Sequence, residues 1–194
     1  MRTLDFFVVD IPKRLNDTIR TQGGLELFVD TKFDEFSHRI TEGEVVASPE
    51  RYDIEVSSGD TLYFHHLVVV NDGQPLTGVE NHYIVKCDKQ FTLNNQAFAY
   101  KCRKTGRIHP LFGWTLLEAV DQEDEPASEI IEIVKIEEDP VRTGRVSFDC
   151  DELAELGVKK GDVVGFAKDM DYRIQIDDKE YYRVRAEDLL YVET

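Results

Sequence analysis

The sequence has few of the residues on which disulfide, metal and catalytic sites depend. In 194 residues it holds three cysteines, five histidines, two methionines and one tryptophan. Cys87, Cys102 and Cys150 are odd in number and show no CxxC spacing, which favours free thiols in a reducing compartment. No apolar run approaches the roughly 18 residues of a membrane span, and the N-terminus lacks a signal-peptide pattern. We therefore expect a soluble, cytoplasmic protein.

Positive charge is also scarce. Lys and Arg number 23 against 39 Asp and Glu, giving a formal net charge of −16. Such a surface repels phosphate backbones and anionic lipids, so we expect neither nucleic acid nor a membrane as partner. The charge is uneven, with 13 basic and 16 acidic residues up to Ile108 and 10 and 23 beyond it. This asymmetry indicates two units with different surfaces.

Motifs that carry known chemistries are missing. There is no nucleophile elbow, P-loop or dinucleotide-binding fingerprint. His65 and His66 are adjacent, so a regular strand would direct them to opposite faces, and no other His or Cys spacing fits a structural zinc motif. Cys150 stands between two aspartates, whose charge raises the pKa of a thiol and weakens it as a nucleophile. We expect no catalysis, no metal and no cofactor.

What the sequence does contain is a series of short runs rich in Val, Ile, Phe and Tyr, separated by Gly, Asn, Asp or Pro. Regular short runs of this kind predict an all-β fold, either a sandwich or a barrel. Only Asp149–Leu156 has a helical pattern. The predicted strands are Phe6–Val9, Gly43–Ala47, Thr61–Val70, His82–Cys87, Ala97–Cys102, Trp114–Val120, Val163–Phe166, Tyr172–Ile176 and Tyr181–Arg185.

Comparing the chain with itself predicts a tandem duplication. Val56–Phe64 and Val158–Phe166 share the pattern V-x-x-G-D-x-x-x-F, in which Gly and Asp form a turn before a strand. Two further pairs flank them in the same order: Gly43–Val46 with Gly144–Ser147, and Phe98–Arg103 with Tyr181–Arg185. On this alignment the first copy is longer, which predicts an insert over about residues 71–95 that forms one or two added hairpins.

These motifs resemble the GroES-type co-chaperonin family, present twice. In the second half, Gly157–Phe166 followed by Ile174–Val192 is similar to the final strands of that family. In the first half, Asp10-Ile11-Pro12, then Gly23–Leu27, then Gly43–Val46 resemble its mobile loop and the strand that follows. The resemblance spans most of the chain outside the insert. It implies two irregular β-barrels, residues 1–108 and 109–194, joined near Ile108-His109-Pro110.

The resemblance also implies a function. Members of the family form rings that cap a chaperonin cylinder, and a loop of each subunit docks on the chaperonin's apical domains. Here that loop would be about residues 18–41, which is long and polar, with Gly23, Gly24, Leu25, Glu26 and Leu27 at its tip. Leu25 and Leu27 lie on one side if the tip is extended. The family usually has an apolar residue where Glu26 stands. The implied partner is a GroEL-type chaperonin, and the implied assembly is a homo-oligomeric ring.

The second half offers a different sequence at the position of this loop. The stretch Glu118–Asp139 is strongly acidic and lacks a glycine pair, and it contains Ile130, Ile131 and Ile133. These isoleucines form either a second docking tip or a core strand, and their dense β-branching favours the strand.

A second hypothesis is a non-catalytic β-barrel interaction or assembly module, for example in a virion, that has lost chaperonin binding. The environment of Leu25 and Leu27 separates the two hypotheses, because docking needs them exposed. A duplicated co-chaperonin also points to a bacteriophage, which would place the protein in the cytoplasm of the host.

Overall fold

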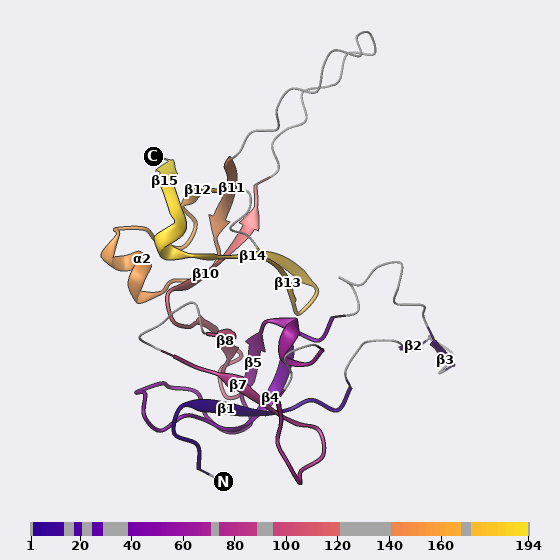
Figure 1. The fold of residues 1–194 in the computed structure, drawn as a ribbon. Coiled ribbons are helices and arrows are strands. Elements are labelled where there is room, and N and C mark those ends of the chain that lie inside the picture. Colours follow the sequence, from indigo (N-terminus) through magenta and orange to yellow (C-terminus); the bar gives the residue numbers. More distant parts are fainter. Residues whose placement is uncertain are drawn as a thin grey trace. The chain divides into compact units, whose positions relative to one another are not determined.

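The structure is a computed structural model that describes residues 2–13, 18–20, 25–28, 39–70, 74–88, 95–120, 141–167 and 172–193. The chain separates into two compact units, Met1–Ile108 and His109–Thr194 (Figure 1). Strands dominate both, and the α-helix of the described residues, α2 (Asp151–Glu155), is five residues long. The expectation of a predominantly β protein is therefore confirmed.

The first unit holds six strands of a seven-stranded sheet with the order β6-β7-β1-β4-β5-β8-β9, and β9 lies at the boundary between the two units. Its central strands are buried on both faces, because consecutive residues such as Phe7, Val8 and Val9 are all shielded from solvent. The strands are β1 (Phe6–Asp10), β4 (Glu42–Ala47), β5 (Thr61–Phe64), β6 (Gln74–Pro75), β7 (His82–Lys86), β8 (Ala97–Lys101) and β9 (Ile108–Pro110).

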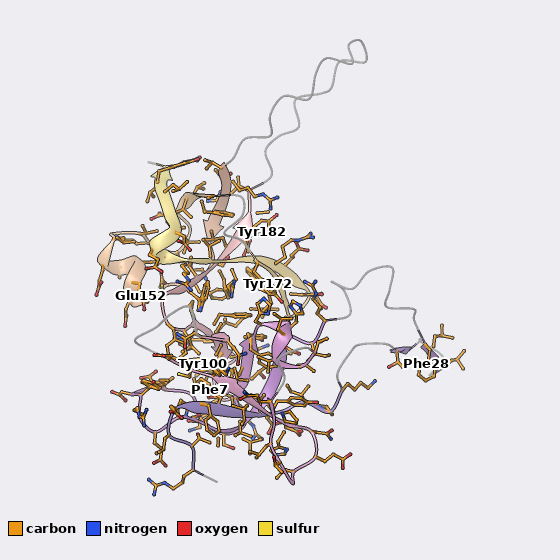
Figure 2. The ribbon with its side chains drawn as sticks, in the orientation of Figure 1. Phe7, Phe28, Tyr100, Glu152, Tyr172 and Tyr182 are labelled. Atoms are coloured by element: carbon orange, nitrogen blue, oxygen red, sulfur yellow. The ribbon has the colours of Figure 1, made fainter. Side chains whose placement is uncertain are left out.

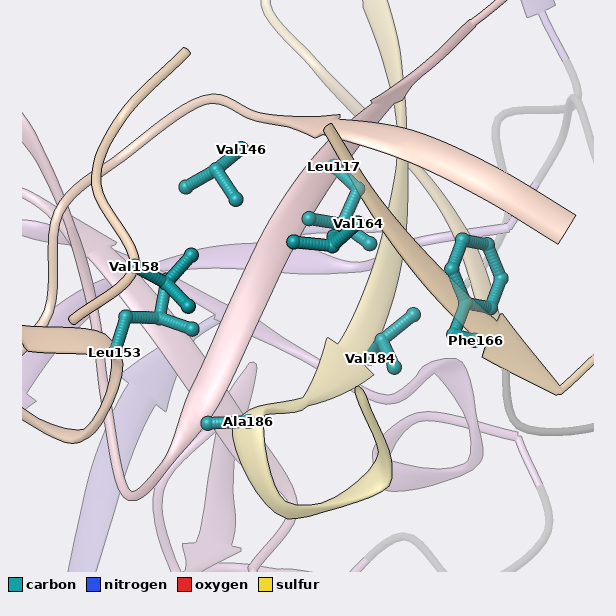
Figure 3. Close-up of a cluster of buried hydrophobic side chains, with 8 residues drawn as sticks. All are labelled: Leu117, Val146, Leu153, Val158, Val164, Phe166, Val184 and Ala186. Atoms are coloured by element: carbon teal, nitrogen blue, oxygen red, sulfur yellow. The ribbon is translucent and has the colours of Figure 1, made fainter. Parts of the chain in front are cut away.

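The second unit contains a six-stranded sheet with the order β13-β14-β10-β11-β12-β15. Leu117, Val164 and Val184 from three of its strands pack with Leu153 of α2 and with Val146, Val158, Phe166 and Ala186 in one buried apolar cluster (Figure 3). The strands are β10 (Trp114–Ala119), β11 (Val141–Val146), β12 (Val163–Ala167), β13 (Tyr172–Ile176), β14 (Lys179–Arg185) and β15 (Leu189–Glu193). Two 3-10 turns complete the elements, η1 (His66–Val68) in the first unit and η4 (Ala186–Asp188) in the second.

Six strands of each unit follow the same order along the chain and the same order in the sheet. β1, β4, β5, β6, β7 and β8 correspond in turn to β10, β11, β12, β13, β14 and β15. The register agrees as well: β5 pairs with β8 through a shift after Tyr63, and β12 pairs with β15 through a shift after Gly165. At these shifts Tyr63 faces Ala99, whereas Gly165 faces Tyr191.

The Gly-Asp turn before β5 recurs before β12 with the same hydrogen bonds. Gly59 and Gly161 have φ values of 89° and 97°, in the left-handed region that favours glycine. Their amides donate to the carbonyl oxygens of Val45 and Val146, each over 2.8 Å. The carboxylate of the following aspartate accepts from a backbone amide three residues earlier, at 2.8 Å for Asp60 and 2.9 Å for Asp162. The pattern shared by the two halves of the sequence thus encodes one local structure.

The strand register corrects one pair of the sequence alignment. Phe98–Arg103 contains β8, which pairs with β5, whereas Tyr181–Arg185 lies in β14, which pairs with β10. The strand that corresponds to β14 is β7, and Tyr83–Lys86 matches Tyr182–Arg185 in the pattern Y-x-V-basic. The similarity of aromatic and basic residues in β8 and β14 had concealed this match.

The predicted insert at about residues 71–95 lies partly outside the described residues, and the hairpin expected in it is not an addition to the first unit. That range holds the β6–β7 hairpin, and the second unit has its counterpart in the β13–β14 hairpin. Gln74 faces Ile84 in one hairpin as Tyr172 faces Arg183 in the other. The described connections around this hairpin differ between the units: η1 lies between β5 and β6, whereas η4 lies between β14 and β15.

Two further expectations change. The predicted strand Thr61–Val70 ends at Phe64, because His65 turns the chain into η1 and its Nδ1 accepts a hydrogen bond from the Leu67 amide over 3.3 Å. Among the described residues the strand pairing closes neither sheet into a barrel, since both orders are linear. None of these residues belongs to a helix long and apolar enough to cross a bilayer.

Candidate functional site

The predicted docking segment contains a small hairpin between β1 and β4. β2 (Thr18–Arg20) and β3 (Glu26–Phe28) pair antiparallel and form a two-stranded sheet of their own (Figure 1). The backbone register places Arg20 opposite Glu26 and Thr18 opposite Phe28. The glycine pair Gly23-Gly24 falls between the two strands and lies outside the described residues.

Three apolar side chains of this hairpin are exposed to solvent. The exposed fraction is 62% for Leu25, 47% for Leu27 and 82% for Phe28, which is labelled in Figure 2. Leu25 and Leu27 are two residues apart in extended chain and share a side, whereas Phe28 takes the opposite face of β3. Neither leucine is a core residue. The sequence analysis did not select Phe28, although it directly follows the tip motif.

The tentative second docking residues, Ile130, Ile131 and Ile133, lie outside the described residues. Only the place in the chain of the segment that contains them can be given. It connects β10 to β11, as the segment with the β2–β3 hairpin connects β1 to β4. The two candidate segments are therefore attached at corresponding places of the two sheets.

The outer edge of β15 is a second candidate surface. β15 pairs with β12 on one side and ends the six-stranded sheet on the other. Leu190, Tyr191 and Val192 are consecutive residues of this strand, and all three are exposed. In the first unit the corresponding strand, β8, is followed in its sheet by β9. An edge strand with exposed apolar residues is a surface on which another strand can pair.

The pKa values of two thiols, Cys102 and Cys150, are shifted in opposite directions. Hydrogen bonds from the Thr105 hydroxyl and from the amides of Thr105 and Lys104 lower the pKa of Cys102. Burial raises the pKa of Cys150 to about 11, with a smaller contribution from the charge of Glu152. Burial thus dominates at Cys150, where the sequence analysis had considered only neighbouring charge.

The described residues do not bring a metal site together. Within this part of the chain no three His, Cys, Asp or Glu side chains cluster in a way that could hold an ion. His65 and His66 do not point to opposite faces of a strand, because the strand has already ended; their rings stack with centroids 4.5 Å apart.

Comparison with known proteins adds no relative to this description: no known family model matches the chain, and no curated protein is significantly similar to it.

Proposed function

We propose that the protein is a co-chaperonin that caps a GroEL-type chaperonin through the β2–β3 hairpin and assists protein folding without catalysis. The observation that carries this proposal is the exposure of Leu25 and Leu27 on the hairpin that holds the tip motif. Both leucines are exposed to solvent, so a partner that covers them would bury apolar surface. Within this proposal, each of the two units is one GroES-like barrel, and the units arose by tandem duplication.

The energetics suit a reversible cap. Burying two leucine side chains contributes about 3–6 kcal/mol before the cost of ordering the segment is subtracted. One such contact is weak. A ring of chains presents several hairpins at once, so the effective concentration after the first contact makes the whole cap bind strongly.

The edge of β15 supports the ring in this proposal. A chain that exposes the apolar residues of β15 can pair this edge with a neighbouring copy, and a closed ring leaves the edge covered in every copy. The same edge favours the second hypothesis, an assembly module without chaperonin binding, if the hairpin has no chaperonin partner. We place the protein in the cytoplasm, and in a phage-infected host if the chain is viral.

The test replaces Leu25 and Leu27 with serine in the full chain. The double variant should lose binding to purified GroEL-type chaperonin, because its apolar docking surface is gone, while its melting temperature changes by less than about 2 °C. Binding is measured by co-sedimentation and stability by thermal unfolding. The matched control is Leu4→Ser with Leu156→Ser, since these leucines are 58% and 61% exposed outside the hairpin; it should bind normally.

Three other outcomes have distinct meanings. If the wild-type chain does not bind chaperonin, the proposal fails and the assembly module remains. If the Leu25 and Leu27 variant binds with unchanged affinity, the docking residues lie elsewhere, with Ile130, Ile131 and Ile133 as the next to change. If that variant unfolds, the two leucines support the fold, and the proposal loses the observation that carries it.

A further inference from the structure

The turn between β8 and β9 concentrates positive charge in an acidic chain. Residues 101–107, the basic turn, hold Lys101, Arg103, Lys104 and Arg107 and no Asp or Glu, whereas the whole chain has 39 acidic and 23 basic residues. Three of these side chains, Arg103, Lys104 and Arg107, are exposed. Neither the sheet nor the docking hairpin accounts for this charge.

Backbone hydrogen bonds fix the shape of the basic turn. The Cys102 amide donates to the Arg107 carbonyl oxygen over 2.9 Å, and the Gly106 amide donates to the Cys102 carbonyl oxygen over 2.8 Å. The Arg103 amide donates to the carboxylate of the buried Asp60, also over 2.8 Å. A turn held in this way presents its side chains from a defined backbone, so a partner that binds them orders little additional chain.

The three exposed cations of the basic turn form no ion pair within the part of the chain that the structure describes. The ion pairs found there join other residues, for example Arg51 with Asp5 and Lys179 with Glu118. Arg103, Lys104 and Arg107 can therefore pair with carboxylates from outside this part of the chain.

The sequence contains a segment of the opposite charge. The part of the acidic stretch that follows β10, residues 121–139, holds nine Asp and Glu and one Lys. These residues lie outside the described ones, and their charge is known from the sequence. A cluster of Arg and Lys binds carboxylates by charge-assisted hydrogen bonds, so the basic turn and the acidic stretch are complementary.

The formal net charge of −16 makes such a contact useful between copies of the chain. Copies with this charge repel one another, and an attractive local contact offsets the repulsion where they meet. In a ring, each interface joins one surface of a copy to a different surface of its neighbour. The basic turn and the acidic stretch give every copy one surface of each sign.

We propose that the basic turn of each copy binds the acidic stretch of a neighbouring copy. This inference rests on the ring of the proposed function and not on chaperonin binding. Because the cations of the turn are exposed, dissolved salt screens the contact over about 8 Å at physiological ionic strength. The contact therefore guides the association of copies most strongly at low salt.

The first experiment reverses two charges of the turn in the absence of chaperonin. Lys104→Glu with Arg107→Glu sets carboxylates against the acidic stretch, so the chain concentration at half-assembly should rise at least tenfold at low salt. The matched control, Lys86→Glu with Lys159→Glu, makes the same change in net charge at two exposed lysines outside the turn, and it should assemble like the wild type. Sedimentation velocity measures assembly, and thermal unfolding checks that both variants fold.

A second experiment separates contact between copies from contact within one chain. Chains with and without a heavy nitrogen isotope are mixed, allowed to exchange, and treated with a carbodiimide, which joins an amine to a nearby carboxylate as an amide with loss of water. Mass spectrometry should find Lys104 joined to residues 121–139 of a chain with the other isotope. Cross-links of Lys104 to this stretch within single chains alone would place the contact inside one copy and overturn the proposal.

The remaining outcomes distinguish this inference from the proposed function. If the wild-type chain stays monomeric, there is no neighbouring copy, and both the ring and the contact are wrong. If the Lys104 and Arg107 variant assembles as well as the wild type, the contact is wrong and the ring stands. If the wild type assembles through this contact but does not bind a GroEL-type chaperonin, the proposed function fails and the contact is confirmed.

Discussion

The two units of this chain share a frame and differ in what is attached to it. Six strands follow the same order with the same register, and even the shift between the third and sixth strands recurs. The connection between the first two strands differs completely: one carries an apolar tip with a glycine pair, and the other carries the acidic stretch that follows β10. The comparison shows that strand order and pairing are the same in both units, whereas the sequence of the segment between the first two strands differs. Such connecting segments tolerate change and often carry binding residues.

The units also differ at one edge. β9 extends the sheet beyond β8, whereas the sheet of the second unit ends at β15. Among the described residues, the second sheet has no strand at the position that corresponds to β9. Three experiments test how far the correspondence between the units extends.

The largest effect is expected at the aspartates of the two Gly-Asp turns. Asp60 is buried and accepts from the amides of Ser57 and Arg103, each over 2.8 Å, while Asp162 is less buried and accepts from the Lys159 amide. Asp60→Ala should therefore lower the free energy of unfolding by about 3 kcal/mol and Asp162→Ala by about 1 kcal/mol. Urea unfolding of both variants measures the difference.

Asp60→Asn is the control for that experiment. An amide keeps one acceptor oxygen, so this variant should lose less stability than Asp60→Ala. Equal losses at Asp60 and Asp162 would show that the Arg103 contact adds nothing and that the two turns are energetically alike.

A smaller loss of stability is expected at two glycines, each on the second strand of its unit, that lie close to residues at the end of the first strand. A Cβ at Gly144 would lie 2.8 Å from the Cβ of Leu117, a buried atom that cannot swing away. A Cβ at Gly43 would lie 3.0 Å from Cγ1 of Ile11 and 3.1 Å from the carbonyl oxygen of Asp10, contacts that are longer than the one at Gly144. We expect Gly144→Ala to cost about 2 kcal/mol and Gly43→Ala about 1 kcal/mol. Thermal unfolding measures the stability of both variants. A larger loss for Gly43→Ala than for Gly144→Ala would contradict the contact distances at the two glycines.

The smallest effect concerns reactivity rather than stability. Because the pKa of Cys102 is lowered and that of Cys150 is raised to about 11, thiolate forms at lower pH in the first unit than in the second. At pH 8, iodoacetamide should alkylate Cys102 at least tenfold faster than Cys150, as followed by peptide mass spectrometry. Thr105→Val removes the hydroxyl that donates to the Cys102 thiolate and should slow the alkylation of Cys102. Equal rates would contradict the assigned environments.

Much of this fold could be predicted because its strands are encoded locally. Alternating Val, Ile, Phe and Tyr between turn residues marked most strands, and the V-x-x-G-D pattern marked the same turn twice. The predicted strands did not include β2, β3, β6 and β9, since strands of two or three residues leave no periodic signal. They also did not include the longer strands β11 and β15. The alignment of β8 with β14 failed because a shared mixture of aromatic and basic residues does not specify which neighbour a strand takes.

The candidate site was predictable only in part. Leu25 and Leu27 were selected because Gly23–Leu27 resembles the mobile-loop motif of the co-chaperonin family. Phe28 was missed because sequence alone does not tell an exposed phenylalanine from a buried one. The effect of burial on Cys150 was missed for the same reason, since its surroundings come from α2 and the core cluster.

The aromatic residues at the strand shift have a consequence for building chimeras of this chain. In the first unit β5 supplies the large residue, Tyr63, and β8 the small one, Ala99; in the second unit β12 supplies Gly165 and β15 supplies Tyr191, whose ring covers the glycine. Transplanting β5 alone in place of β12 would set two tyrosines against each other, and the reciprocal graft would leave a gap. Strands can therefore be exchanged between the two units only as pairs. A chimera keeps the packing at the shift only when both strands of a pair, β5 with β8 or β12 with β15, are moved together.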